Sequence, residues 1–582
     1  MRIPRRSLLK SFVTAAAAPF LASGQRFASA PLDLMIRNGR VIDGSGLPAF
    51  QGDVGIKGDA IVALGRLPGA NATKVIDAGG LVVAPGFIDP HTHEEVLMLR
   101  DAALEKFVRQ GVTTIINGNC GHSIAPFPSA KILEYWWREG LISKQAAQQL
   151  AEQSHWDSLA GYADAVRQCG GASINSALLL GYGGIRWIAM RGGYERPPNG
   201  EEWKRIETSL REGLSQGAVG MSTGLSYIPC RYADTDELVR AGKILAQFNA
   251  TYASHTRFGR PGDPTGGKEA IEIGERAGCR VQISHFVGAS SDALEMVTSA
   301  RRRGLEVAAD IIPSSLSHRR RSDRMLEALF VFYPGLFDKS IEELRTFLVS
   351  PEGRTSATKS VQFLNTPKDA MVIVRAETPK NRPLVGKSVA QIGKERQQDS
   401  DELLIALILD EQNPVVFTFD GDRRARREPT SEELERRFGK GRFLEPGEWT
   451  RHPLCMPGSD SIPVDSGDPY GWYEQQRRGA FPAFLHDAQR AGVPLEQAVQ
   501  KATSLAANQF RLRDRGLLAE GKAADVIVFD PEEYRFPTPA EADPNEPFAL
   551  ARGVRHVVVN GKLVLTDDKM TGVRPGRVLL NA

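Results

Sequence analysis

Two histidines, His91 and His93, stand one residue apart directly after residues 82–88, a short apolar segment that we interpret as a buried strand. Side chains at positions i and i+2 of an extended segment point to the same side of the chain. Both imidazoles can therefore reach one metal ion. A catalytic zinc ion needs neutral nitrogen ligands and an open position for water, so this pair predicts a site that activates water for hydrolysis.

Four more side chains with metal-binding atoms follow short apolar segments elsewhere: Cys120, His255, His285 and Asp460. A single histidine at a strand end is more often structural than a ligand. Here, however, four of the ten histidines fall at predicted strand ends of one region. Thiolate and imidazole are ligands that zinc prefers, so the set predicts a zinc centre assembled from several strand ends.

The strands that must position these residues alternate with helices through the middle of the chain. Strands are expected at 112–117, 177–180, 218–222, 251–254, 280–284 and 307–312, and helices at 201–216, 235–249 and 267–277. This α/β alternation favours a parallel sheet and, at this length, a (β/α)₈ TIM-like barrel. Catalytic residues of such barrels lie at the C-terminal ends of the strands, where the candidate ligands fall.

Both ends of the chain are rich in hairpin patterns, including an Asn-Gly turn at 560–561. We expect residues 31–85 and 511–582 to form one small β-sandwich domain, and residues 86–510 to form the barrel. The alternation is interrupted within about 320–445, where the chain is charged and helical. This stretch is either an insertion or lid, or a set of ordinary barrel helices with solvated faces.

The first 30 residues differ from the rest of the 582-residue chain. Arg5 and Arg6 precede an alanine-rich apolar run at 11–22 and a small-residue cleavage site at 28–30. This pattern predicts a removable export signal of the twin-arginine type, which directs a protein to the periplasm or the medium. The alternative is a membrane anchor, but the run is short for a span of about 20 residues, and no stable membrane anchoring is expected.

Charge and cysteine content exclude other classes of protein. The leader holds five basic and no acidic side chains, so removing it leaves 68 basic and 70 acidic ones, and we expect no nucleic-acid partner. Five cysteines are an odd, sparse set that argues against a disulfide framework. Apart from Cys120, they are expected to be buried or incidental: Cys169, Cys230, Cys279 and Cys455.

The motifs that carry the candidate ligands resemble those of a known family. Residues 86–93 resemble the entry motif of the amidohydrolase superfamily, which many metal hydrolases share. Five segments resemble the D-aminoacylase (N-acyl-D-amino-acid deacylase) branch: residues 118–121, 222–227, 254–255, 283–285 and 515–525. The Gly-Asn-Cys-Gly and Ser-Thr-Gly-Leu sequences among them are much more specific than the entry motif.

The resemblance implies two adjoining metal positions. The tight zinc would be held by Cys120, His255 and His285, and a second, weaker position by His91, His93 and Asp460. Cys120 would take the bridging place that a carboxylated lysine has in many relatives. Asp460 would be catalytic, accepting a proton from the attacking water and passing it to the departing amine. Its alternative role is that of a turn or helix N-cap aspartate.

Substrate recognition is where the sequence departs from this branch. Relatives bind the substrate carboxylate with a lysine at the position of Val287, and with a tyrosine where this chain has residues 311–315. Arg319 could replace them through a bidentate contact; the alternative is a solvated basic loop. Tyr227 and Ser314 are the other candidate substrate-binding residues.

Several neighbours of the ligands have more than one interpretation. Glu94 and Glu95 either tune the metal ligands without binding the metal themselves or begin a solvated helix. Asp89 could orient the end of its strand. His122 is expected to line the pocket and not to bind metal.

The sequence therefore predicts an exported zinc-dependent amidohydrolase that cleaves the amide C–N bond of an N-acyl-D-amino acid or a related small amide. Two alternatives remain: a hydantoinase- or dihydroorotase-like hydrolase of cyclic amides or imides, and a non-catalytic binding protein on the same barrel. All six candidate metal-site side chains are present, which disfavours the binding protein. The oligomeric state is not indicated.

Overall fold

The computed structural model of the chain describes residues 31–138, 142, 144–257, 265–286, 291–313, 319–321, 346–363, 368, 371–376, 378–410, 416–419, 446–463, 479–537 and 549–580. The predicted export signal at 1–30 lies outside these residues, and so do Val287 and Ser314.

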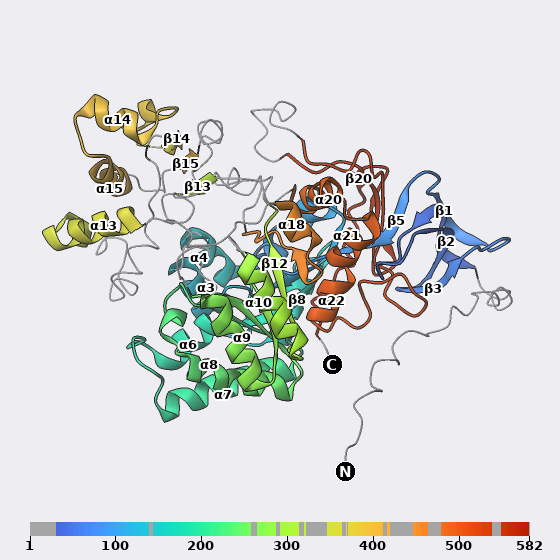
Figure 1. The fold of residues 1–582 in the computed structure, drawn as a ribbon, viewed down its shortest axis with the longest axis horizontal. Helices are drawn as coiled ribbons and strands as arrows, with labels where there is room; N and C mark the ends of the chain where they lie inside the picture. The colour runs from blue at the N-terminus through green and yellow to red at the C-terminus, as the bar shows by residue number, and fades with distance from the viewer. Residues whose placement is uncertain are drawn as a thin grey trace, which may run out of the picture.

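Eight parallel strands form a nearly closed barrel, in the order β16-β12-β11-β10-β9-β8-β7-β6 (Figure 1). They are β6 (Phe87–Asp89), β7 (Val112–Asn117), β8 (Asn175–Gly181), β9 (Gly220–Gly224), β10 (Thr251–His255), β11 (Arg280–Ile283), β12 (Val307–Ile311) and β16 (Cys455–Pro457). The predicted fold class is confirmed, and the six strands expected from the sequence are displaced by at most two residues at either end. Every residue of the eight strands is buried, as expected for a parallel sheet covered on both faces.

The interior of the barrel is a packed core and not a channel. Apolar side chains from successive strands meet there, among them Ile88, Ile116, Leu179 and Ala253, and Phe510 lies against them. Because this core fills the middle, reactive side chains can gather only at the strand ends.

Helices surround the barrel and cover its outer face. They are α1 (Leu97–Arg100), α2 (Glu105–Val108), α3 (Ser129–Arg138), α4 (Lys144–Gln153), α5 (Leu159–Gln168), α6 (Tyr182–Met190), α7 (Gly200–Ser215), α8 (Thr235–Gln247), α9 (Thr265–Ala277), α10 (Ser291–Arg302), α18 (Pro446–Arg451), α20 (Ala480–Arg490), α21 (Leu495–Ala502) and α22 (Ser504–Gln509), with a 3₁₀ turn at Cys230–Tyr232. Helix α7 shows why they form: Asn199 and Glu202 make a capping box. Its buried Trp203, Ile206 and Leu210 recur at helical spacing.

The two ends of the chain share one second sheet, as predicted. Its order is β20-β19-β18-β17-β5-β1-β2-β3, with β4 paired to β1, and most of its neighbours are antiparallel. The strands are β1 (Leu32–Val41), β2 (Phe50–Lys57), β3 (Ala60–Gly65), β4 (Ala72–Asp77), β5 (Val82–Pro85), β17 (Val526–Phe529), β18 (Val554–Val559), β19 (Lys562–Thr566) and β20 (Lys569–Met570). Their buried side chains form a core of their own, with Ile36 and Val54 from one end of the chain and Val526 and Val558 from the other.

The interpretation of residues 82–88 as one strand is wrong. The segment is divided between β5 of the second sheet and β6 of the barrel. The break falls at Gly86, where a Cβ atom would lie 2.1 Å from Thr113 Oγ1. Pro85 and Gly86 therefore let the chain pass between the two sheets at close backbone approach.

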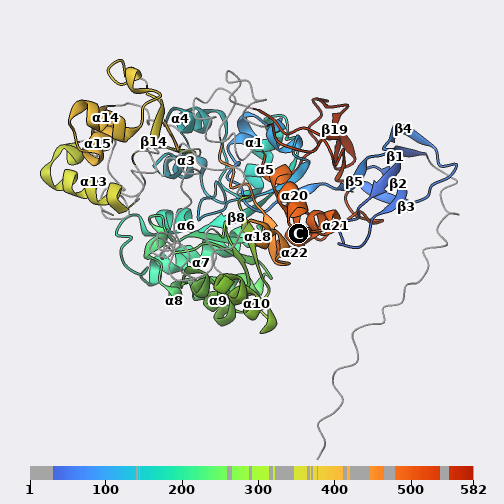
Figure 2. The ribbon, with the colours of Figure 1, turned by 45° about the horizontal axis from the view of Figure 1, so that its top comes forward.

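The stretch within 320–445 is represented by a separate small sheet, β13-β15-β14, and three helices. The elements are β13 (Arg319–Arg321), β14 (Met371–Arg375), β15 (Val416–Phe419), α13 (Pro351–Phe363), α14 (Val389–Arg396) and α15 (Ser400–Asp410), with a 3₁₀ turn at Arg382–Leu384. In both views this group lies on the side of α3 and α4, across the barrel from the sheet formed by the chain ends (Figure 2). None of the helices in the described part of the chain has the length and apolar character needed to cross a bilayer.

Candidate metal centre

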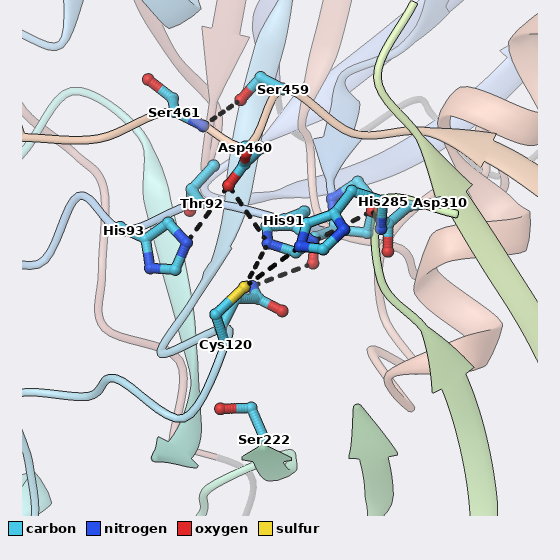
Figure 3. A network of polar contacts seen from close by, with 12 residues as sticks. His91, Thr92, His93, Cys120, Ser222, His285, Asp310, Ser459, Asp460 and Ser461 are labelled. Carbon is cyan, nitrogen blue, oxygen red and sulfur yellow. Dashed lines mark hydrogen bonds and ion pairs between the residues drawn. The ribbon is translucent and has the colours of Figure 1, made fainter. Parts of the chain in front are cut away.

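The six predicted ligands converge at one end of the barrel in two groups that share Cys120. Figure 3 labels His91, His93, Cys120, His285 and Asp460. His91, His93, Cys120 and Asp460 form one group, and Cys120, His255 and His285 form the other; within each group all ligand atoms lie within 4.8 Å of one another. Cys120 Sγ is 3.3 Å from His91 Nε2 and 3.5 Å from His285 Nε2. The thiolate therefore stands between two potential metal positions.

Asp460 faces both histidines of the entry motif. Its Oδ1 is 3.5 Å from His91 Nε2 and 3.4 Å from His93 Nε2. These two histidines do present their rings to the same side, as their spacing predicts. One carboxylate oxygen can thus meet a metal ion or a water molecule held by the pair.

Three of the candidate ligands hold a left-handed backbone: Cys120 at φ 52°, His285 at φ 29° and Asp460 at φ 53°. Residues other than glycine adopt this region only at a cost, and such positions concentrate at functional sites. Each of these residues lies two or three positions beyond the end of its strand, where the chain turns and the side chain meets the shared centre.

Gly224 shows why the Ser-Thr-Gly-Leu motif is so specific. A Cβ atom at this position would lie 2.1 Å from the Cys120 carbonyl oxygen and 2.5 Å from the ring of Tyr227. Ser222, two residues earlier, accepts a hydrogen bond from Gly121 N at 2.9 Å and donates one to Gly118 O at 2.5 Å. The end of β9 therefore fits directly against the loop that carries Cys120.

The charges of the cluster suit a metal centre. Burial raises the pKa of Cys120, but the imidazoles of His91 and His285 outweigh it and bring that pKa well below its ordinary value. Burial lowers the pKa of His91, yet Asp310 and Cys120 raise it well above 6.5. The same competition, with Asp460 and Cys120 opposing burial, raises the pKa of His93 to about 9. A buried thiolate among imidazoles is the donor set that zinc prefers, so the residues present fit this ion.

Asp310 contacts both ligand groups and was not found from the sequence. Its Oδ1 is 3.0 Å from His91 Nδ1 and accepts the backbone N–H of His285 at 2.6 Å. Its Oδ2 accepts from Gln282 Nε2 at 2.7 Å. A carboxylate behind a metal-binding imidazole fixes the orientation of the ring and raises its basicity. The signal was present, because Asp310 is the one charged residue of the otherwise apolar strand β12.

Glu94 and Glu95 are fully buried, so the solvated alternative for them is wrong. The Glu94 carboxylate meets Lys106 Nζ at 2.6 Å and accepts a short hydrogen bond from Ser461 Oγ. Neither carboxylate oxygen of Glu95 has a hydrogen-bond partner among the described residues, and burial raises its pKa to about 8. Asp89 Oδ1 accepts from the backbone N–H groups of His91 and Ser459, each at 3.1 Å, so it does orient the end of its strand.

An aromatic wall borders the cluster. The Tyr227 ring is centred 4.6 Å from that of His255 and 5.4 Å from that of His122. Burial lowers the pKa of His122 to about 3, and its Nδ1 lies 3.3 Å from the hydroxyl of Tyr135. His122 is thus a neutral wall residue, and it belongs to neither ligand group.

The remaining predicted residues lie apart from this cluster or outside the described part of the chain. Arg319 belongs to β13, which pairs with β15 and not with a barrel strand. Ser314 and Val287 are outside the described residues. All five cysteines are free; Cys169 is exposed, and the other three non-ligand cysteines are buried.

Comparison with known proteins places this geometry in a family. A model of the amidohydrolase family matches residues 74–170 and 434–565. The N-acyl-D-glutamate deacylase of Alcaligenes xylosoxydans xylosoxydans is 31% identical over 558 residues, which cover 94% of this chain and 96% of the relative. The chain belongs to the D-aminoacylase branch of the amidohydrolases.

Solved structures agree with this assignment. The N-acyl-D-glutamate deacylase from Bordetella bronchiseptica, complexed with zinc and a phosphonate inhibitor, matches with a TM-score of 0.68 at 27% identity, covering 95% of this chain and 100% of that one. A structure of D-aminoacylase, studied for its binuclear metal centre, matches with a TM-score of 0.69 at 26% identity and the same coverage. The resemblance drawn from the motifs is confirmed.

Proposed function

We propose that this protein is a zinc-dependent hydrolase of the amide C–N bond in an N-acyl-D-amino acid or a closely related small amide. The observation that carries the proposal is the pair of ligand groups sharing Cys120, with Asp460 beside them. The full-length relatives that act on N-acyl-D-amino acids support the substrate class.

Zinc would be held most tightly by Cys120, His255 and His285, and a second, weaker position would use His91, His93 and Asp460. A bound zinc ion would lower the pKa of a water molecule toward about 7 and polarise the amide carbonyl. The neutral walls of His122 and Tyr227 would keep competing charges away from the reacting carbonyl.

Asp460 would carry the proton through the reaction. An amide nitrogen leaves poorly unless it is protonated, so the group that accepts the proton of the attacking water must deliver it to that nitrogen. Oδ1 of Asp460 is suited to this, because it lies within 3.5 Å of both His91 and His93 and its side chain keeps 13% of its surface exposed. Asp310 would hold His91 in one orientation while this happens.

The residues that we propose for binding the substrate carboxylate come from the sequence. Tyr227 would contact the substrate; the neighbourhood of its ring and that of His255 supports this role. Arg319 and Ser314 are the proposed carboxylate-binding residues in place of the lysine that Val287 replaces. If Arg319→Ala leaves KM unchanged, this role for Arg319 is excluded.

Residues 1–30 would direct the protein to the periplasm or the medium through the twin-arginine route. Replacing both Arg5 and Arg6 by lysine should retain the protein in the cytoplasm with its leader attached. Unchanged export of that variant would contradict this assignment.

The test of the proposed function is hydrolysis of racemic N-acyl amino acids by the zinc-loaded protein, with chiral analysis of the amino acid released. Release of D-enantiomers alone supports the proposal. Ring opening of hydantoin-like compounds, without release of amino acids, would assign a cyclic amide hydrolase instead. A protein that neither binds zinc nor turns over any amide would be a binding protein on a hydrolase fold.

A further inference from the structure

One junction of the barrel is built differently from the others. Neighbouring strands are joined by parallel ladders all the way from β6 to β16. Within the described residues, no ladder joins β6 to β16. The segments that follow them meet through an isolated bridge between Thr92 and Ser461 and through the bond from Asp460 N to His91 O at 2.9 Å, and Ser459 N donates to Asp89 Oδ1 of β6. The weaker metal position straddles this junction, with two histidines on one side and an aspartate on the other.

A buried ion pair on the β6 side of this junction contacts Ser461 on the β16 side. Lys106, on α2, places Nζ 2.6 Å from Glu94 Oε1, 3.0 Å from Ser461 Oγ and 3.3 Å from the Ile462 carbonyl oxygen. Ser461 Oγ also donates to Glu94 Oε1. We call these three side chains, Lys106, Glu94 and Ser461, the junction clasp. Two of them directly follow the proposed ligands in sequence: Glu94 follows His93, and Ser461 follows Asp460.

A buried ion pair such as the one in the clasp adds little net stability to a fold. Lys106 is 5% exposed and Glu94 is fully buried. Taking both charges out of water costs about as much as their attraction returns, and well-packed apolar residues often serve stability as well or better. What apolar residues cannot do is fix direction, because charge-assisted hydrogen bonds restrain the positions of their partners while dispersion contacts allow sliding.

We propose that Lys106 and Glu94 are positioning residues that hold Asp460 at its distance from His91 and His93. The clasp thereby sets the affinity of the weaker metal position and the alignment of Asp460 for proton transfer. The tight position is independent of the clasp, because Cys120, His255 and His285 come from other strand ends. This inference rests on the proposed function of the site.

The decisive variant is Lys106→Met combined with Glu94→Gln, which removes both charges together and leaves neither one buried alone. The matched control is Arg515→Met with Asp525→Asn. This second ion pair is equally buried, at 4% side-chain exposure for each partner, but it lies at the other end of the barrel, where Gly86 N donates to the Asp525 carbonyl. If the loss of any buried ion pair were enough to cause the effect, both variants would show it to the same extent.

The readouts are a zinc titration of each metal-depleted protein and its kcat and KM. Wild type should show a tight and a weaker class of zinc site. In the clasp variant the weaker class should lose about 10–100-fold in affinity, the range for residues that orient metal ligands, with the tight class unchanged. Its kcat should fall while KM stays near the wild-type value. The control variant should retain both zinc classes and kcat.

The outcomes separate this inference from the proposed function. A wild-type protein without any tight zinc class would overturn the proposed function itself. If wild type binds zinc tightly but the clasp variant keeps wild-type kcat and any weaker zinc class at full affinity, the clasp is only structural. An equal loss of zinc affinity and kcat in the control variant would also mean that the clasp is only structural. Should the double variant not fold, Ser461→Ala keeps the ion pair and removes one contact, and an unchanged kcat in that variant would overturn the inference.

Discussion

Replacement of Asp310 by asparagine isolates the charge of this carboxylate from its shape. The asparagine carbonyl can take the place of Oδ1, facing His91 Nδ1 at 3.0 Å and the His285 N–H at 2.6 Å. Its NH₂ group then faces Gln282, whose Oε1 has no hydrogen-bond partner among the described residues. A half-turn of the Gln282 amide pairs the two groups again, so the variant loses the charge while keeping its contacts.

The expected size of the effect follows from the two contacts. Hydrogen bonds to an ionised group are roughly twice as strong as neutral ones, which makes each contact weaker by about 1 kcal/mol. Only the contact to His91 Nδ1 bears on the zinc position that includes His91, and about 1 kcal/mol corresponds to roughly a five-fold loss of binding there. We expect the zinc position that includes His91 to weaken by about this factor. The tight position should change less, because there Asp310 contacts only a backbone N–H and not a ligand ring.

Alanine would be the wrong replacement. It would leave His91 Nδ1, His285 N and Gln282 Nε2 buried without an acceptor, at about 1–3 kcal/mol each. That total approaches the whole stability of a typical domain, about 5–15 kcal/mol, so the alanine variant would report on folding.

The assay for Asp310→Asn is zinc binding in competition with a chelator, together with thermal unfolding of the metal-depleted protein. Weaker zinc binding with little change in unfolding temperature is expected. Wild-type zinc affinity and turnover in this variant would refute the argument that the carboxylate tunes the centre through His91.

Three further results are expected. Asp460→Asn should lower kcat by about 10²–10⁴-fold, the usual contribution of a positioned acid–base group, while zinc analysis still finds the tight ion; near-normal turnover would reject its role. Because the pKa of His93 is raised from 6.5 to about 9, the stability that its protonation gives the metal-depleted protein is fully present below pH 6.5 and is lost as the pH rises through about 9. Zinc competes with the same proton, so the zinc affinity of the weaker class of site should increase up to about pH 9, and a flat pH profile in calorimetry would contradict this. Gly224→Ala should destabilise the protein by about 3 kcal/mol, because its Cβ would meet the Cys120 carbonyl. Gly200→Ala, whose new Cβ would meet no atom within 4 Å outside its own helix and its chain neighbours, should not lower the temperature of thermal unfolding.

The ligands were predictable because barrel geometry reduces them to a local rule. Each follows a short apolar strand, and strand ends of a parallel barrel meet on one face. The sequence therefore located His91, Cys120, His255 and His285 without knowledge of their distances. It also located Asp460 after β16, although more than 140 residues separate β12 from β16.

The supporting residues were not predictable in the same way. Lys106 on α2 meets Ser461, which lies 355 positions later in the chain, and no local pattern encodes such a partner. Glu94 looked equally suited to a solvated helix start, because only the burial of the finished barrel shows that it needs a cation. The division of residues 82–88 between two sheets was missed because an apolar run looks the same in either sheet.

The second sheet ties the beginning of the chain to its end. Ala84 of β5 is paired with Ile527 of β17, so the strand that leads into the metal centre has no neighbour on that edge until β17 has left the ribosome. Pairings this distant in sequence form slowly, since a very long loop must close first. A nascent chain that lacks β17, or a truncation that removes it, would therefore expose the unpaired edge of β5 beside the barrel. Synthesis through β17 must therefore precede a complete sheet at the entry to the barrel.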